Sequence, residues 1–297
     1  MCGTIEESNM PIPSDLDRKR PALHESIRAL GRALVAYSGG VDSAFLAWEM
    51  HRVLGSEMLA VIADSPSLAR SQLADAVKFA EEQDIPLEVI ATGEFERPEY
   101  IRNDGSRCFY CKDELFTLME KMRQERGFDA IAYGVNADEQ GDFRPGQTAA
   151  QQHQIAAPLL EAGLTKFEIR ELARQAGLRI WDKPASACLS SRLEYGRPVT
   201  REVLAVVEKG EDALRELGFR QFRVRHHGEI VRIEIAREEM DRALSPQMAA
   251  EFTRIFKDLG FKFVTLDLEG FRSGSMNSLL PAEQLQSGQR FGRAASE

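Results

Sequence analysis

Six consecutive residues, Ser38-Gly39-Gly40-Val41-Asp42-Ser43, have the composition of an anion-binding loop. They follow a short apolar run and precede a segment with helical spacing. The two glycines allow the backbone to approach a ligand closely, and a helix N-terminus offers unpaired N–H groups and the positive end of its dipole. No Gly-Lys-Ser/Thr sequence follows, so this is not a Walker loop. We expect the segment to bind phosphate or pyrophosphate rather than to form an ordinary glycine turn.

Cys188 is a candidate nucleophile. It lies in the stretch Lys183-Pro184-Ala185-Ser186-Ala187-Cys188-Leu189. A thiolate is a strong side-chain nucleophile. Lys183 and Arg192 are near in sequence, and their charges would favour an ionised thiol and an anionic substrate. The competing interpretation is a buried cysteine that only packs.

The pair Cys108-x-x-Cys111 indicates metal or redox chemistry. A zinc ribbon would need a second such pair, which this sequence lacks. With Cys188 the pair gives three thiols, one short of the four that hold an ordinary [4Fe–4S] cluster, so one iron would stay open. The alternative is that Cys108 and Cys111 pack at the start of a helix, and the sequence leaves both interpretations open.

Arg223 and Arg225 alternate along an expected strand, so both point to the same face. Two guanidinium groups on one face suit the phosphate of a nucleotide, although a solvated charged face would look the same. Glu234 would lie across the expected hairpin, where it could orient the arginines or bind a cation. His226 and His227 are adjacent and face opposite ways, which is a poor arrangement for metal ligands.

The elements that must position these residues follow two patterns. Up to about residue 195, short apolar runs alternate with helical segments, which predicts an α/β fold with a parallel, doubly wound sheet. The later order of helix, strand, strand, helix and strand predicts a smaller α+β domain. We therefore expect a loose arm at 1–20, a first domain at 21–195, a second at 196–282 and a tail at 283–297. The expected strands are 34–37, 58–63, 87–91, 130–133, 221–227, 229–236 and 261–268, and the expected helices are 42–54, 67–83, 112–126, 200–217 and 246–259.

The amino-acid composition argues against some classes of protein function. The 297 residues include 38 Lys+Arg and 47 Asp+Glu, for a formal net charge of −9. Phosphate contacts along a nucleic acid need a basic surface, so this balance opposes general nucleic-acid binding. No apolar run approaches the roughly 20 residues of a membrane span, and the polar, acidic start is unlike a signal peptide. We expect a cytoplasmic protein whose thiols are reduced.

The hexapeptide at 38–43 resembles the signature of the PP-loop ATP pyrophosphatases. The resemblance implies that ATP is cleaved to AMP and pyrophosphate with Mg²⁺, and that Asp42 holds the metal or orients the loop. The strand ending at Asp64 resembles the place where such folds contact adenine and ribose. The ATP-binding residues implied are Ser38, Gly39, Gly40, Asp42, Ser43 and Asp64.

Further motifs resemble the LarE family, the ATP-dependent sulfur transferases that build the nickel-pincer nucleotide of lactate racemase. The resemblance covers residues ~25–280 and rests on segments 107–112, 133–139, 144–146, 181–192, 222–228 and 274–277. It implies that a carboxylate of pyridinium-3,5-biscarboxylic acid mononucleotide is adenylylated, and that Arg223 and Arg225 hold the substrate phosphate. In sacrificial members the cysteine displaces AMP, and cleavage of its C–S bond leaves dehydroalanine. Other relatives carry sulfide on a three-cysteine cluster. The family tends to form homo-oligomers.

Three alternatives remain at this stage. An ammonia-dependent ligase of the NAD or GMP synthetase kind has no need of Cys188 or the cysteine pair. A tRNA thiolase would need a basic surface. A non-catalytic nucleotide-binding regulator would not need the segment around Cys188.

Overall fold

The computed structural model describes residues 13–140, 145–184 and 187–272. The expected motif residues Arg144, Ala185, Ser186 and Gly274–Asn277 lie outside the described residues, as does Cys2. The helices are α1 (Pro13–Ala29), α2 (Val41–Leu54), α3 (Arg70–Glu82), α4 (Pro98–Ile101), α5 (Arg107–Arg126), α6 (Pro145–Gln152), α7 (Pro158–Glu161), α8 (Lys166–Gln175), α9 (Arg201–Glu216), α10 (Met240–Ala243) and α11 (Pro246–Asp258). The strands are β1 (Ala33–Ala36), β2 (Met58–Asp64), β3 (Leu87–Ala91), β4 (Ala130–Tyr133), β5 (Phe222–His227), β6 (Ile230–Ile235) and β7 (Phe263–Leu266).

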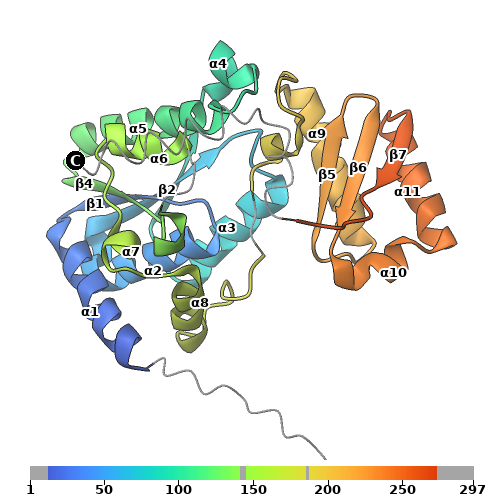
Figure 1. Ribbon diagram of the computed structural model, residues 1–297. Helices are drawn as coiled ribbons and strands as arrows, with labels where there is room; N and C mark the ends of the chain where they lie inside the picture. The colour runs from blue at the N-terminus through green and yellow to red at the C-terminus, as the bar shows by residue number, and fades with distance from the viewer. Residues whose placement is uncertain (1–12, 141–144, 185–186, 273–297) are drawn as a thin grey trace, which may run out of the picture.

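The first sheet has the strand order β3-β2-β1-β4, and every pairing in it is parallel. Its central strands are buried on both faces, as expected for a sheet covered by helices on both sides. Val35 and Tyr37 face α2 and α3, whereas Leu34 and Ala36 face α5 and α6. These three layers confirm the predicted α/β fold with a parallel sheet (Figure 1).

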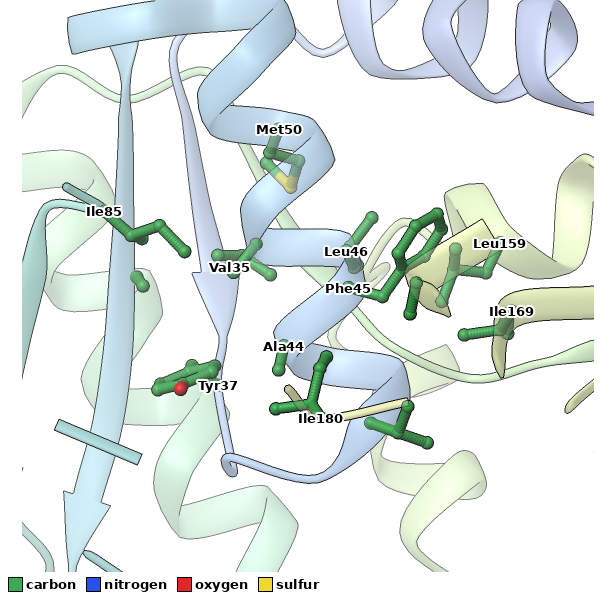
Figure 2. Packing of buried hydrophobic residues seen from close by; sticks show 14 of the residues in the cluster. Val35, Tyr37, Ala44, Phe45, Leu46, Met50, Ile85, Leu159, Ile169 and Ile180 are labelled. Atoms are coloured by element: carbon green, nitrogen blue, oxygen red, sulfur yellow. The ribbon is translucent and has the colours of Figure 1, made fainter. Parts of the chain in front are cut away.

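The larger core lies between this sheet and the layer of α1, α2, α7 and α8. Figure 2 shows Phe45 and Leu46 of α2 beside Leu159 of α7 and Ile169 of α8. The four side chains are buried in one cluster with β1. Burial of a large apolar side chain is worth about 1.5–3 kcal/mol, so this cluster holds α2 firmly against the strand that precedes it.

The second sheet has the order β5-β6-β7, with β5 antiparallel and β7 parallel to β6. Helices α9 and α11 cover its apolar face, where Val224, Val231 and Ile233 are fully buried. Because side chains alternate along a strand, Arg223 and Arg225 share the other face with Glu234. The order of helix, strand, strand, helix and strand is present as expected, whereas the domain boundaries remain predictions.

Helix α1 corrects the expected loose arm at residues 1–20, because it begins at Pro13. Leu16 is buried in the main core, and Lys19 Nζ lies 2.7 Å from Glu168 Oε1 of α8. The apolar positions of this helix lie far apart in sequence, so no helical period was visible in its first turns. Helix α5 also begins earlier than expected, at Arg107, which places Cys108 and Cys111 in its first turns. Within the described part of the chain, no helix is long and apolar enough to cross a bilayer.

Candidate active site

The residues that follow β1 form a tight turn, which we call the glycine loop (Ser38–Ser43). Gly39 has a φ of +69°, a backbone conformation that side chains other than glycine rarely adopt. A Cβ at Gly39 would also lie 2.4 Å from Ala76 Cβ of α3. Gly40 caps α2 and makes no side-chain hydrogen bond, so the cap residue itself does not compete for the amides of the first turn. This backbone fits the anion-binding loop that the sequence predicts, and the role itself stays a prediction.

The glycine loop lies where the strand order reverses, between β1 and β4. In open parallel sheets this switch point is where ligands bind. Gly134, directly after β4, packs against the same loop: a Cβ there would lie 2.8 Å from the backbone nitrogen of Ser43. Within the loop, Ser38 Oγ and Ser43 Oγ are 3.0 Å apart, so the two hydroxyls hold each other in place.

Asp42 lies in the first turn of α2 with an ion pair to Lys166 at the start of α8. Its Oδ2 accepts this bond, whereas the buried Oδ1 has no hydrogen-bond partner among the described residues. A buried carboxylate oxygen without a partner is costly unless a ligand satisfies it. The Asp42 carboxylate therefore fits a hard cation such as Mg²⁺, which prefers oxygen ligands.

Two further residues expected at the site have charged partners. Lys183 Nζ donates to the Gly39 carbonyl oxygen at 3.0 Å and also pairs with Asp75 of α3. Its charge therefore lies at the glycine loop, whereas the sequence had placed it beside the Cys188 thiol. Asp64, at the end of β2, pairs with Arg70, which also donates to the Ser65 carbonyl oxygen at 2.6 Å.

Cys188 is the second residue of a short segment, here called the cysteine loop (Ala187–Arg192), whose last four residues form a single 3₁₀ turn. The amide of Leu189 donates to the Ser67 carbonyl oxygen at 2.8 Å, which joins the loop to the chain just after β2. Tyr100 Oη lies 2.7 Å from Ser190 Oγ, and Arg107 Nη1 donates to the Ser190 carbonyl oxygen at 2.8 Å. The first sheet and α5 thus fix the loop from two sides.

The thiols of Cys108 and Cys111 lie near that of Cys188, because its charge acts on the pKa of both. Burial, the charge of Cys188 and that of Glu94 raise the pKa of the Cys111 thiol well above its usual range. The pKa of Arg107 is raised despite its burial, because thiolates at Cys188 and Cys108 would stabilise its charge. Yet among the described residues no three His, Cys, Asp or Glu side chains are placed to hold a metal ion. The thiols suit an iron–sulfur cluster in chemical type, but this arrangement does not place them as ligands.

The expected phosphate-binding residues lie beside the cysteine loop. Arg225 is buried, pairs with Glu234 Oε2 at 2.8 Å, and donates to the Ser191 carbonyl oxygen at 3.0 Å. Burial and the neighbouring charges of Arg192 and Arg225 lower the pKa of Arg223 to about 10. Such crowding of positive charge favours a bound anion. Both carboxylate oxygens of Glu234 lie within ion-pair distance of arginines, which fits its orienting role better than cation binding.

Several residues that contact the site were not identified from the sequence. Lys166 and Asp75 meet the glycine loop from α8 and α3, and Glu211 pairs with Arg192 from α9. Gly134 belongs to a segment that the sequence had singled out, but its contact with the glycine loop was not foreseen. No sequence motif marks Lys166, Asp75 or Glu211, because each is far in sequence from the residue that it contacts in the fold.

Comparison with known proteins extends this description. No protein-family model matches the chain. An uncharacterised protein of Synechocystis is 40% identical over 265 residues, which are 89% of this chain and 99% of that protein. The pyridinium-3,5-bisthiocarboxylic acid mononucleotide synthase of Lactiplantibacillus plantarum is 34% identical over 272 residues, 91% of this chain and 98% of that enzyme. The tRNA-specific 2-thiouridylase of Geobacter metallireducens is 30% identical over 202 residues, 54% of each chain.

Fold and site together define the class: a parallel α/β protein with a glycine loop at the switch point of its sheet. Within this class, the chain belongs to the sulfurtransferase family that includes the mononucleotide synthase of L. plantarum. The aligned region covers 91% of this chain and 98% of that enzyme, so it spans the positions of the glycine loop, the cysteine pair and the cysteine loop.

Proposed function

We propose that this enzyme uses ATP to adenylylate the carboxylates of pyridinium-3,5-biscarboxylic acid mononucleotide and converts them to thiocarboxylates with the sulfur of Cys188. The observation that carries the proposal is the placement of the cysteine loop. The Leu189–Ser67 hydrogen bond anchors it just beyond β2, next to the strand that leads into the glycine loop. Activation and sulfur transfer would then occur at neighbouring strand ends.

The glycine loop is proposed to bind the β- and γ-phosphates of ATP. The amides of the first turn of α2 and the hydroxyls of Ser38 and Ser43 would contact the phosphates, and Asp42 would hold Mg²⁺. The metal ion, when bound, offsets phosphate charge and favours departure of pyrophosphate. Asp64, at the end of the next strand, is proposed to face the nucleoside. Adenylylation turns a poor carboxylate electrophile into one with AMP as its leaving group.

Arg223 and Arg225 are proposed to hold the substrate phosphate. They lie on the face of the second sheet that meets the cysteine loop, through the bond from Arg225 to the Ser191 carbonyl oxygen. A phosphate held there would place the pyridinium carboxylate near Cys188. The thiolate would attack the acyl adenylate, release AMP and form a thioester, and rupture of the Cβ–Sγ bond would leave the thiocarboxylate.

The sulfide-carrying cluster remains the second candidate for the source of sulfur. It is favoured by the approach of Cys108 and Cys111 to Cys188, because the charge of Cys188 acts with burial to raise the pKa of both thiols. The sacrificial route needs only Cys188 and no metal geometry, so we place it first.

The proposal is tested by incubating the purified chain with ATP, Mg²⁺ and the biscarboxylic acid mononucleotide. The expected products are AMP, pyrophosphate and a thiocarboxylated nucleotide. Cys188→Ser should still release pyrophosphate and form the acyl adenylate, but it should form no thiocarboxylate. ADP as the main nucleotide product, or thiocarboxylate from the serine variant, would contradict the proposal.

A further inference from the structure

The main-chain carbonyl oxygen of Cys188 accepts three hydrogen bonds. The donors are the Ser191 amide at 3.0 Å, Ser191 Oγ at 2.8 Å and Arg192 Nη1 at 3.0 Å. A neutral peptide oxygen has two lone pairs, so three donors, one of them a cation, exceed its ordinary need. The arrangement suits an oxygen that takes on negative charge.

The cationic donor is held rigidly. Arg192 is 1% exposed and pairs with Glu211 through two hydrogen bonds, of 2.8 Å and 3.2 Å. Its Nη1 also lies 2.7 Å from the Ala187 carbonyl oxygen and 2.9 Å from Ser191 Oγ, so its two N–H groups are shared among three acceptors. Donors fixed before a reaction need no reorganisation as charge develops, which is how oxyanion holes stabilise their transition states.

The sacrificial route contains one step that places charge on this oxygen. In the thioester intermediate, a base removes the Cα proton of Cys188, and the resulting carbanion is shared with the adjacent carbonyl oxygen as an enolate. Thioester formation, in contrast, occurs at Sγ and does not draw on the main-chain carbonyl. The three donors therefore match the elimination and not the nucleophilic attack.

We propose that Ser191 and Arg192 form an oxyanion hole for the Cys188 enolate and so promote the release of sulfur, an inference that rests on the proposed sacrificial function. Water accepts the Cα proton, since Cys188 is half-exposed. The C–H electron pair becomes the Cα=Cβ bond of dehydroalanine. The Cβ–Sγ bond breaks with its electrons on sulfur, which leaves as the thiocarboxylate, so no oxidant or reductant is needed.

Ser191→Ala is the sharpest test, because it removes the hydroxyl donor and keeps the amide donor and the buried ion pair. The reaction is started with ATP and the biscarboxylic acid mononucleotide and stopped in acid at intervals. Intact mass then separates free protein, thioester adduct and dehydroalanine protein, while AMP release is followed in parallel. We expect unchanged AMP release, accumulation of the adduct and elimination slowed by about 10²-fold.

Two variants serve as controls. Ser191→Thr keeps a hydroxyl and should restore elimination. Ser190→Ala removes a neighbouring hydroxyl that contacts Tyr100 instead of the Cys188 carbonyl, so it should leave the ratio of adduct to dehydroalanine as in the unaltered protein.

Two results would overturn the oxyanion hole while leaving the proposed function intact. One is elimination at the unaltered rate in Ser191→Ala, and the other is equal slowing of AMP release and elimination, which indicates a structural role. If the unaltered protein forms neither adduct nor dehydroalanine, the proposed sacrificial function fails, and the oxyanion hole fails with it.

Discussion

The glycine loop and the cysteine loop lie near neighbouring strand ends, yet different interactions hold them. The glycine loop depends on backbone shape, with Gly39 at positive φ and Gly134 packed against Ser43, and Asp42 Oδ1 has no hydrogen-bond partner among the described residues. The cysteine loop depends on side chains from distant elements, above all the buried pair of Arg192 and Glu211. The glycine loop therefore suits the proposed binding of a ligand, whereas the cysteine loop is held by contacts within the protein itself.

This difference predicts how each loop would respond to mutation. A change in the glycine loop removes a contact that we propose for ATP, so it should mainly affect the rate of AMP formation. A change in the supports of the cysteine loop leaves a buried charge behind and should also affect folding. Substitutions in and around the two loops test this division.

Asp42→Asn should abolish AMP formation, with a loss of about 10³-fold, because the substitution removes the charge proposed to hold Mg²⁺. The urea midpoint of unfolding should change little, since only a half-exposed partner, Lys166, loses its ion pair. AMP is measured by chromatography after incubation with ATP and substrate. Near-normal AMP formation by this variant would remove Asp42 from the ATP site.

Glu211→Ala should instead destabilise the fold by about 3–5 kcal/mol, because it leaves the Arg192 guanidinium buried without its carboxylate. The measurement is the free energy of unfolding in urea. A matched control is Glu251→Ala, which breaks an exposed pair with Arg254 and should cost less than about 1 kcal/mol. Equal effects of the two variants would refute the contrast drawn between the loops.

Some parts of the fold and of the site could be predicted from the sequence, and others could not. The parallel sheet, the glycine loop and the alternation of Arg223 with Arg225 could be predicted, because each depends on a local pattern of apolar period, glycine or strand alternation. Helix α1 was missed because its buried leucines are widely spaced. The pairing of Arg192 with Glu211 and the contacts of Lys166 and Asp75 could not be predicted, since each joins elements whose proximity only the fold creates.

Arg223→Lys should weaken binding of the biscarboxylic acid mononucleotide by about 10- to 150-fold, because lysine loses the forked, charge-assisted contact with phosphate. ATP binding should remain normal, since Arg223 lies on the second sheet. Calorimetric titration of each ligand separates the two effects. Unchanged affinity for the mononucleotide in both Arg223→Lys and Arg225→Lys would refute the phosphate assignment.

His153, directly after α6 and away from both loops, gives an example of an ordinary ion pair. Burial acts to lower its pKa, but Asp113 at 2.9 Å and Glu120 at 3.0 Å raise it above the usual value. The pairing therefore stabilises the fold at low pH, and the gain is lost as pH rises through the raised pKa. His153→Gln should lower the unfolding free energy by up to about 1 kcal/mol near pH 5.5 and by less near pH 8.5. An equal loss at both pH values would contradict this account.

The central claim, that Cys188 gives up its own sulfur, is tested most directly by the intact mass of the Cys108→Ser, Cys111→Ser double variant after one turnover. The sacrificial route predicts that this variant reacts once, converts Cys188 to dehydroalanine and loses the mass of H₂S. The unaltered protein should do the same without bound iron. The contrary result would be an inactive double variant together with unaltered protein that binds about four irons per chain and turns over repeatedly with added sulfide. That outcome would assign the sulfur to a cluster held by the three cysteines.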